Sequence, residues 1–215
     1  MQSLSLASYP LVGTIIDDDF NAALSDITGR TPSPLNVGTT YGTAFVFAGG
    51  TSYPLKTVTT SGGRALNAST AQAQSSSRIN LLTSEQLVTV QAFLASGTTG
   101  DKAIGCAVRC DATAQSGYTV YINHSSVNVF RWNAGAATTI GTISKASGYY
   151  ANASYTITLK ATGTTIVFTL SGGRSESLTI TGQTLFQTNT YIAFSMRNGI
   201  NTTDTYLSNG RGEPA

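Results

Sequence analysis

The clearest alternation of apolar and polar residues in this chain covers residues 155–170, YTITLKATGTTIVFTL. Every second position in each half of the segment is apolar: Tyr155, Ile157, Leu159, Ala161, Ile166, Phe168 and Leu170. A period of two places these side chains on one face of an extended strand. Gly163 stands between the halves, where a tight reversal requires a positive φ. The segment is therefore predicted to be a β-hairpin with one apolar face.

A hairpin of this kind is not stable alone, so the rest of the chain should supply further strands and a second sheet. Short strand-like segments separated by Gly, Asn and Ser recur about every ten residues, which is typical of a sandwich. They cover residues 43–48, 55–59, 65–67, 77–82, 87–95, 103–110, 118–123, 127–132, 138–143, 177–181, 191–197 and 205–207. We therefore predict an all-β fold of two antiparallel sheets.

The segment 85–95, EQLVTVQAFLA, is long enough and rich enough in Leu and Ala to form a helix. However, Val88, Val90, Ala92 and Leu94 alternate with more polar residues, and β-branched side chains favour a strand. We interpret the segment as a strand. Residues 21–40, which include Pro32 and Pro34, are expected to form a long loop with one helical turn at residues 21–26.

The 215 residues are expected to form one domain over residues 17–215, preceded by an arm at residues 1–16. This arm is either an ordinary first strand or a segment that docks onto a neighbouring subunit. The first 20 residues lack the basic and continuous apolar regions of an export signal. We therefore expect synthesis in a cytoplasm without standard export.

Charged residues make up only 10% of the chain and the formal net charge is +2, while 40% of the residues are hydrophobic. The twelve Lys and Arg are scattered, so no basic stripe is available to follow a phosphate backbone. No apolar run approaches the roughly 20 residues that span a bilayer. We therefore expect neither nucleic acid nor a membrane among the partners.

The two cysteines, Cys106 and Cys110, are four residues apart in a predicted strand. If the strand is regular they share a face but lie about 13 Å apart, which is beyond disulfide reach. A metal or redox pair would require further ligands that the sequence does not supply nearby. We expect two reduced, packed thiols.

The pair of predicted strands at residues 118–132 carries the candidate binding site. Tyr118, Val120 and Ile122 should face the core together with Val127 and Val129. The opposite face would carry the rings of Tyr121, Phe130 and Trp132 with the amides of Asn123 and Asn128, and Arg131 would lie nearby. Aromatic rings stack on sugar faces and amides bond to hydroxyls. The same residues would equally suit a second packed face or a subunit interface.

Catalytic and metal-binding patterns are missing from the sequence. The only local cluster of carboxylates is Asp17, Asp18 and Asp19, whereas a glycosidase needs two carboxyl groups that face each other across a bond. The single histidine, His124, is placed in a predicted turn without an orienting carboxylate, and we expect it to face water. We predict no enzyme, no cofactor and no metal. Asp101, Asp111 or the Asp17–Asp19 run could serve as calcium ligands, but we interpret them as solvated turn aspartates.

Several segments in order resemble the concanavalin A-like jelly roll in its laminin G-like form, as found in bacteriophage and bacterial surface proteins. They are DDDF, AIGCAVRCDATAQSGYTVYIN, VNVFRWNAGAATTIGT, SYTITLKATGTTIVFTLSGG, YIAFSMRNG and DTYLSNGRG, and the resemblance as a whole covers about residues 17 to 209. The resemblance implies a jelly-roll β-sandwich whose first and last strands are adjacent. Its enzymatic members carry carboxylates at alternate positions of a short strand, and this sequence has no such strand.

The resemblance implies two functions. The first is a non-enzymatic phage virion component, a capsid decoration or tail-fibre protein, located in the virion and bound to other virion proteins and to copies of itself, for example as a trimer. The alternative is a carbohydrate-binding module or adhesin for surface glycans, with Tyr121, Phe130, Trp132, Asn123, Asn128 and Arg131 as its site. A fold of this kind supports both functions, so the residues of the site have to decide between them.

Overall fold

The computed structural model of the 215-residue chain describes ten segments: residues 16–20, 25–26, 34–35, 52–53, 55–58, 64–67, 74–95, 102–112, 115–197 and 205–215. The strand predicted at residues 43–48 and the arm predicted at residues 1–16, apart from Ile16, lie outside these segments. All regular structure in them is β-strand. No helix of the described part is long and apolar enough to cross a membrane.

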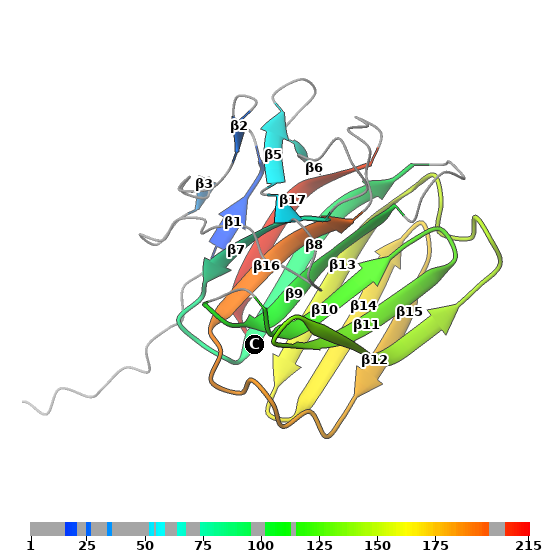
Figure 1. Ribbon diagram of the computed structural model, residues 1–215. Coiled ribbons are helices and arrows are strands. Elements are labelled where there is room, and N and C mark those ends of the chain that lie inside the picture. Colours follow the sequence, from blue (N-terminus) through cyan, green and yellow to red (C-terminus); the bar gives the residue numbers. More distant parts are fainter. Residues whose placement is uncertain are drawn as a thin grey trace, which may run out of the picture.

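The first of two sheets contains ten strands (Figure 1). Its main path is β15 (Glu176–Ile180), β14 (Thr165–Gly172), β13 (Ala153–Thr162), β8 (Gln86–Leu94), β17 (Tyr206–Pro214), β6 (Arg64–Asn67), β5 (Leu55–Val58) and β2 (Ser25–Asp26). Beside this path, β1 (Ile16–Asp18) pairs with β17 and with β3 (Pro34–Leu35). A strand near the start of the chain therefore lies against the last one. Because Ser25 and Asp26 are extended, the helical turn predicted at residues 21–26 is wrong there.

The second sheet contains seven strands and packs over the first (Figure 1). Its order is β12 (Ala136–Ser144), β11 (Ser126–Asn133), β10 (Gly117–Ile122), β9 (Ala103–Cys110), β16 (Tyr191–Arg197), β7 (Gln74–Asn80) and β4 (Ser52–Tyr53). All pairings in both sheets are antiparallel except that of β4 with β7. The predicted all-β sandwich of two antiparallel sheets is confirmed.

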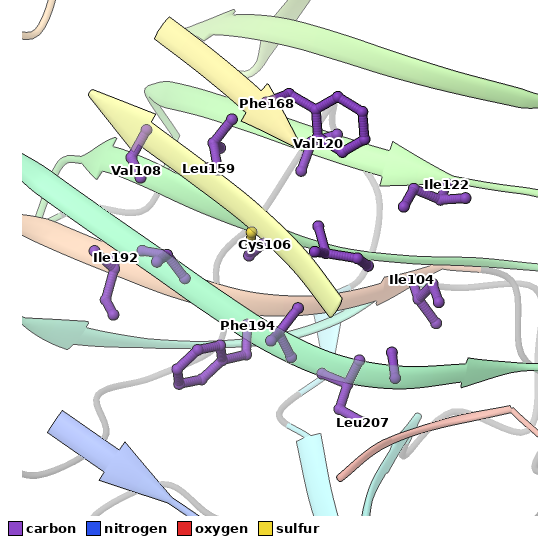
Figure 2. Packing of buried hydrophobic residues seen from close by; sticks show 14 of the residues in the cluster. Ile104, Cys106, Val108, Val120, Ile122, Leu159, Phe168, Ile192, Phe194 and Leu207 are labelled. Atoms are coloured by element: carbon purple, nitrogen blue, oxygen red, sulfur yellow. The ribbon is translucent and has the colours of Figure 1, made fainter. Parts of the chain in front are cut away.

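The hydrophobic core lies between the sheets and takes alternate residues from both. Figure 2 shows side chains of β9, β10 and β16 beside those of the ten-stranded sheet, among them Ile104, Val120, Leu159 and Phe168. In the predicted hairpin, now β13 and β14, all seven alternating apolar residues are buried, and Thr162 pairs with Thr165 around Gly163. In β8 the residues Val88, Val90, Ala92 and Leu94 are buried as well. The two-residue period therefore identified both the strands and their inward faces.

The last strand is longer than the sequence pattern indicates. The predicted strand ends at Leu207, but β17 continues to Pro214 and pairs with β8. Its inward positions include two buried glycines, Gly210 and Gly212. A Cβ on Gly210 would lie only 2.7 Å from the Phe194 ring, so this site accepts no larger residue without a shift of the core. A large ring on one sheet is thus accommodated by a glycine on the other.

A β-bulge in β9 reverses the alternation at its end. Ala107 is opposite Ala193 and Cys110 is opposite Tyr191, so two residues of β9 face a single residue of β16. Arg109, in the bulge, has a φ of 51°. Cys106 therefore packs in the main core, whereas Cys110 packs in a separate cluster on the outer face of the sheet. The prediction that the cysteines share a face is wrong, because it assumed a regular strand.

Both thiols are free and buried. Desolvation by burial is the main cause that raises the pKa of each, and for Cys110 the neighbouring Asp111 adds to the effect. A neutral buried thiol is unreactive, because the thiolate is the nucleophile and the metal ligand. This environment agrees with the prediction of reduced, packed cysteines.

The fully buried side chain of Arg109 ties together one end of the sandwich. It donates from Nε to the Ser84 carbonyl at 2.9 Å and from Nη1 to the Gly163 carbonyl at 2.7 Å. Nη2 lies 3.1 Å from Glu85 Oε1. The Glu85 carboxylate in turn accepts a hydrogen bond from the Gly163 amide at 2.9 Å. One arginine thus joins strand β9 to the start of β8 and to the turn of the β13–β14 hairpin.

Candidate functional site

The three rings of the candidate site lie together on the outer face of the seven-stranded sheet. Thr119 is opposite Phe130, and Tyr121 is opposite Asn128 in the β10–β11 register. The ring centroids of Tyr121 and Phe130 are 6.3 Å apart, and those of Phe130 and Trp132 are 6.0 Å apart. Tyr118, Val120, Ile122, Val127 and Val129 are buried in the main core on the inner face. The predicted division of residues between the two faces therefore matches the structure.

Two of the three rings are nevertheless buried. The exposed fraction is 3% for Tyr121 and 5% for Trp132. Trp132 packs with the small residues Ala107, Cys110 and Ala193. Tyr121 leans over Gly105, since a Cβ on that glycine would lie 3.2 Å from Tyr121 Cδ1. In this conformation only Phe130, which is half-buried, offers part of a ring to an outside ligand.

A ladder of hydrogen-bonded amides and hydroxyls runs beside the rings. Thr142 Oγ1 donates to Asn128 Oδ1 at 3.1 Å, and Asn128 Nδ2 donates to Ser126 Oγ at 2.8 Å. Ser126 Oγ donates to Asn123 Oδ1 at 3.0 Å. Asn128 is half-buried and Thr142 is exposed. The ladder holds polar groups in fixed positions next to Phe130, as recognition of a polyhydroxylated ligand requires.

Asn123 and Arg131 are placed differently from the other predicted site residues. Asn123 Oδ1 also accepts from the backbone amides of Ser125 and Ser126, so this side chain holds the turn between β10 and β11. Arg131 is opposite Tyr118 in the register, and Tyr118 belongs to the inner face. Arg131 therefore does not share a face with Phe130. The strand alternation already implied this, because adjacent residues of a strand point to opposite faces.

His124 is half-buried instead of open to water as predicted. Its Nε2 lies 2.9 Å from the Ala95 carbonyl oxygen, and its own carbonyl accepts from the Tyr150 amide at 3.0 Å. The residue thus links the β10–β11 turn to two other segments. Among the described residues, no three His, Cys, Asp or Glu side chains form a group that could hold a metal ion.

Comparisons with known proteins bear on the fold. The evolved Dit protein of Lactobacillus casei BL23 phage J-1 contains a CBM2 module that is 10% identical, with a TM-score of 0.59 over 95% of this chain and 97% of that module. The lectin UEA-II in complex with galactose is 8% identical, with a TM-score of 0.53 over 93% and 97% of the two chains. This chain has the lectin-like jelly-roll fold.

A third structure with the lectin-like jelly roll is the lumenal domain of VIP36 bound to Ca²⁺ and Man3GlcNAc. It is 8% identical, with a TM-score of 0.52 over 90% of this chain and 91% of that one. No family model matches the chain, and no curated protein matches it. At identities this low, the likeness of the structures establishes the architecture alone. The function therefore has to be argued from the residues.

Proposed function

We propose that this chain is a non-catalytic glycan-binding module whose ligand contacts the outer face of β11 and β12. The observation that carries the proposal is the half-exposed Phe130 beside the preformed Asn128–Thr142 ladder. A sugar presents C–H groups on one face and hydroxyls at its edge, so a ring next to amides and hydroxyls complements both. The likeness to a galactose-bound lectin and to a phage CBM2 module supports the same class of ligand.

Truncation of Phe130 is the direct test. Phe130→Ala is expected to weaken glycan binding about tenfold or more, because a central aromatic contact is removed while the ladder remains. A glycan array would first identify the ligand, and calorimetry would then compare the affinities of the two proteins for it. Phe130 is preferable to Trp132, since Trp132 is packed at 5% exposure and its truncation would also alter folding.

The matched control is Val167→Ala, which truncates a half-buried residue on the outer face of β14 in the other sheet. It should leave the affinity unchanged. Asn128→Ala, which interrupts the ladder, should weaken binding without removing a ring. If the array shows no glycan, or if Phe130→Ala binds as tightly as the unaltered chain, the proposal is wrong.

A second candidate function is that of a phage virion component, such as a capsid decoration or tail-fibre protein. It is favoured by the likeness to the phage J-1 Dit module, which extends over 95% of this chain. The protein is then expected in purified phage particles, where mass spectrometry would detect it, and in contact with copies of itself. Absence from the particles, together with a monomeric mass by light scattering, would contradict this role.

A further inference from the structure

A second group of rings and amides lies on the opposite side of the sandwich, on the outer face of the ten-stranded sheet. Phe93 of β8 and Tyr206 of β17 are opposite each other in the register. Their ring centroids are 5.6 Å apart and the ring planes differ by 25°, so the rings are stacked. Both residues are half-buried. In contrast to Tyr121 and Trp132, each of these rings keeps part of its surface open to an outside ligand.

The amides of Gln91 and Asn209 lie next to this ring pair. The two residues are opposite each other on β8 and β17, and both are exposed. Asn209 Nδ2 donates to Gln91 Oε1 at 2.8 Å, and Ser208 Oγ donates to the Gln91 carbonyl at 3.3 Å. Among the residues that the structure describes, none forms a hydrogen bond with the two Nε2 hydrogens of Gln91 or with Oδ1 of Asn209. The amide pair therefore presents donors and an acceptor side by side.

A bulge brings these residues onto one face. Between Leu207 and Asn209 the register of β17 against β8 shifts by one residue. Tyr206 and Asn209 are three residues apart and would lie on opposite faces of a regular strand, but the extra residue places both outward. The strand end is also anchored, because Thr205 Oγ1 accepts from the buried Ala95 amide at 3.1 Å. The rings and amides are thus held in position before any ligand arrives.

We propose that Phe93, Tyr206, Gln91 and Asn209 form a second saccharide site, which takes a neutral sugar. Stacked rings offer an apolar surface for the C–H face of a sugar, and the amide pair matches hydroxyls, which both donate and accept. The four residues carry no charge. The nearest charged side chains on the outer face of β17, Arg211 and Glu213, bind each other at 2.7 Å. Among the side chains that the structure describes on β8 and β17, a charged ligand would therefore lose solvation without gaining an ionic partner that is not already paired.

This second site uses a different sheet and different residues from those of the proposed function. The two ring surfaces lie on the two outer faces of the sandwich, so one chain would hold two saccharides on opposite sides. A module with this arrangement can link two glycan chains. A single flat glycan surface cannot reach both sites of one chain at once. The two sites therefore give no gain in affinity on such a surface, because avidity requires simultaneous binding at both.

The test uses the full chain labelled with ¹⁵N and a panel of galactose, glucose, mannose and N-acetylglucosamine. Titration with at least one of these sugars should shift the side-chain amide signals of Gln91 and Asn209 in a saturable way. Phe93→Ala should weaken that response at least tenfold. Phe130→Ala is the matched control, a half-buried phenylalanine on the other sheet, and it should leave the response unchanged.

A second variant, Gln91→Ala, covers the case in which Phe93→Ala fails to fold, since Gln91 is exposed. It should weaken the response of the Asn209 signal at least tenfold. Signals that do not shift with any of the four sugars, or shifts that persist in the folded variants, would overturn the second site. Binding at Phe130 would be unaffected by that outcome, so the two proposals can fail separately.

Discussion

Arg109→Ala is expected to lower the free energy of unfolding by about 3 to 5 kcal/mol. The side chain is fully buried. Its loss would remove the hydrogen bond that it donates to the Ser84 carbonyl and the shorter of the two hydrogen bonds that the Gly163 carbonyl accepts. Both carbonyls are partly accessible to water, so most of the cost comes from the volume that the fully buried arginine leaves empty, and the lost hydrogen bonds add to it. Urea unfolding followed by circular dichroism would measure the change.

Arg174→Ala provides the control for this prediction. Arg174 also donates to two backbone carbonyls, those of Tyr149 and Gly173, but it is exposed. Water can replace its hydrogen bonds, and its exposed contact with the Tyr149 ring contributes about 0.5 to 1 kcal/mol, so its loss should change the stability by no more than about 1 kcal/mol. Equal effects of the two variants would show that Arg109 does not hold the end of the sandwich together.

Gly105→Ala is expected to destabilise the chain by about 3 kcal/mol or more. A Cβ at this position would collide with the carbonyl oxygen of Val120 and lie 2.9 Å from its carbonyl carbon. Both atoms belong to the backbone of the paired strand β10 and cannot turn aside as a flexible side chain would. The variant should therefore open the β9–β10 pairing, and thermal unfolding would report a lower Tm.

A second glycine-to-alanine change, at a position where the added Cβ meets no atom, serves as the control. It is needed because any such change also lowers the conformational entropy of the unfolded chain. Gly148 has a φ of 78° and no atom within 4 Å of an added Cβ. Gly148→Ala should cost only the left-handed backbone conformation, about 1 kcal/mol. If Gly105→Ala is no worse than this control, the close approach of β9 and β10 is not a constraint on the sequence.

Much of the fold could be predicted because strand alternation is a local property. The hairpin of β13 and β14 and the strand β8 show an uninterrupted two-residue period, and their apolar residues are the buried ones. The period also assigned Val120 and Phe130 to opposite faces of the seven-stranded sheet. Local alternation indicates a strand and its inward face without any knowledge of the partner strands.

Other features depend on contacts between distant segments and were therefore missed. Arg109 is polar but fully buried, because its partners come from the loop before β8 and from the β13–β14 turn. The end of β17 gave no strand signal, because its inward residues Gly210 and Gly212 are small where Phe194 and Ile192 are large. When a large side chain of one sheet packs against a glycine of the other, neither segment alone shows the alternation of large apolar residues that indicates a strand.

The candidate site could be predicted only in part, because the burial of its rings depends on contacts between distant segments. Alternation placed Tyr121, Phe130 and Trp132 on one face, but it could not show that two of the rings are buried there. Binding of a glycan by these residues stays a prediction. The pair Phe93 and Tyr206 is separated by more than a hundred residues, and only the pairing of β8 with β17 brings the two rings together.

Because the bulge at Arg109 places the two cysteines on opposite faces of β9, each thiol becomes accessible through a different opening of the structure. Cys106 is sealed between the two sheets, so an alkylating reagent can reach it only when the sheets separate. Cys110 is sealed under the outer cluster with Trp132, so it becomes reactive when that cluster opens. Labelling kinetics at the two positions would therefore distinguish loosening of the outer face from separation of the sandwich, within one strand and without any added probe.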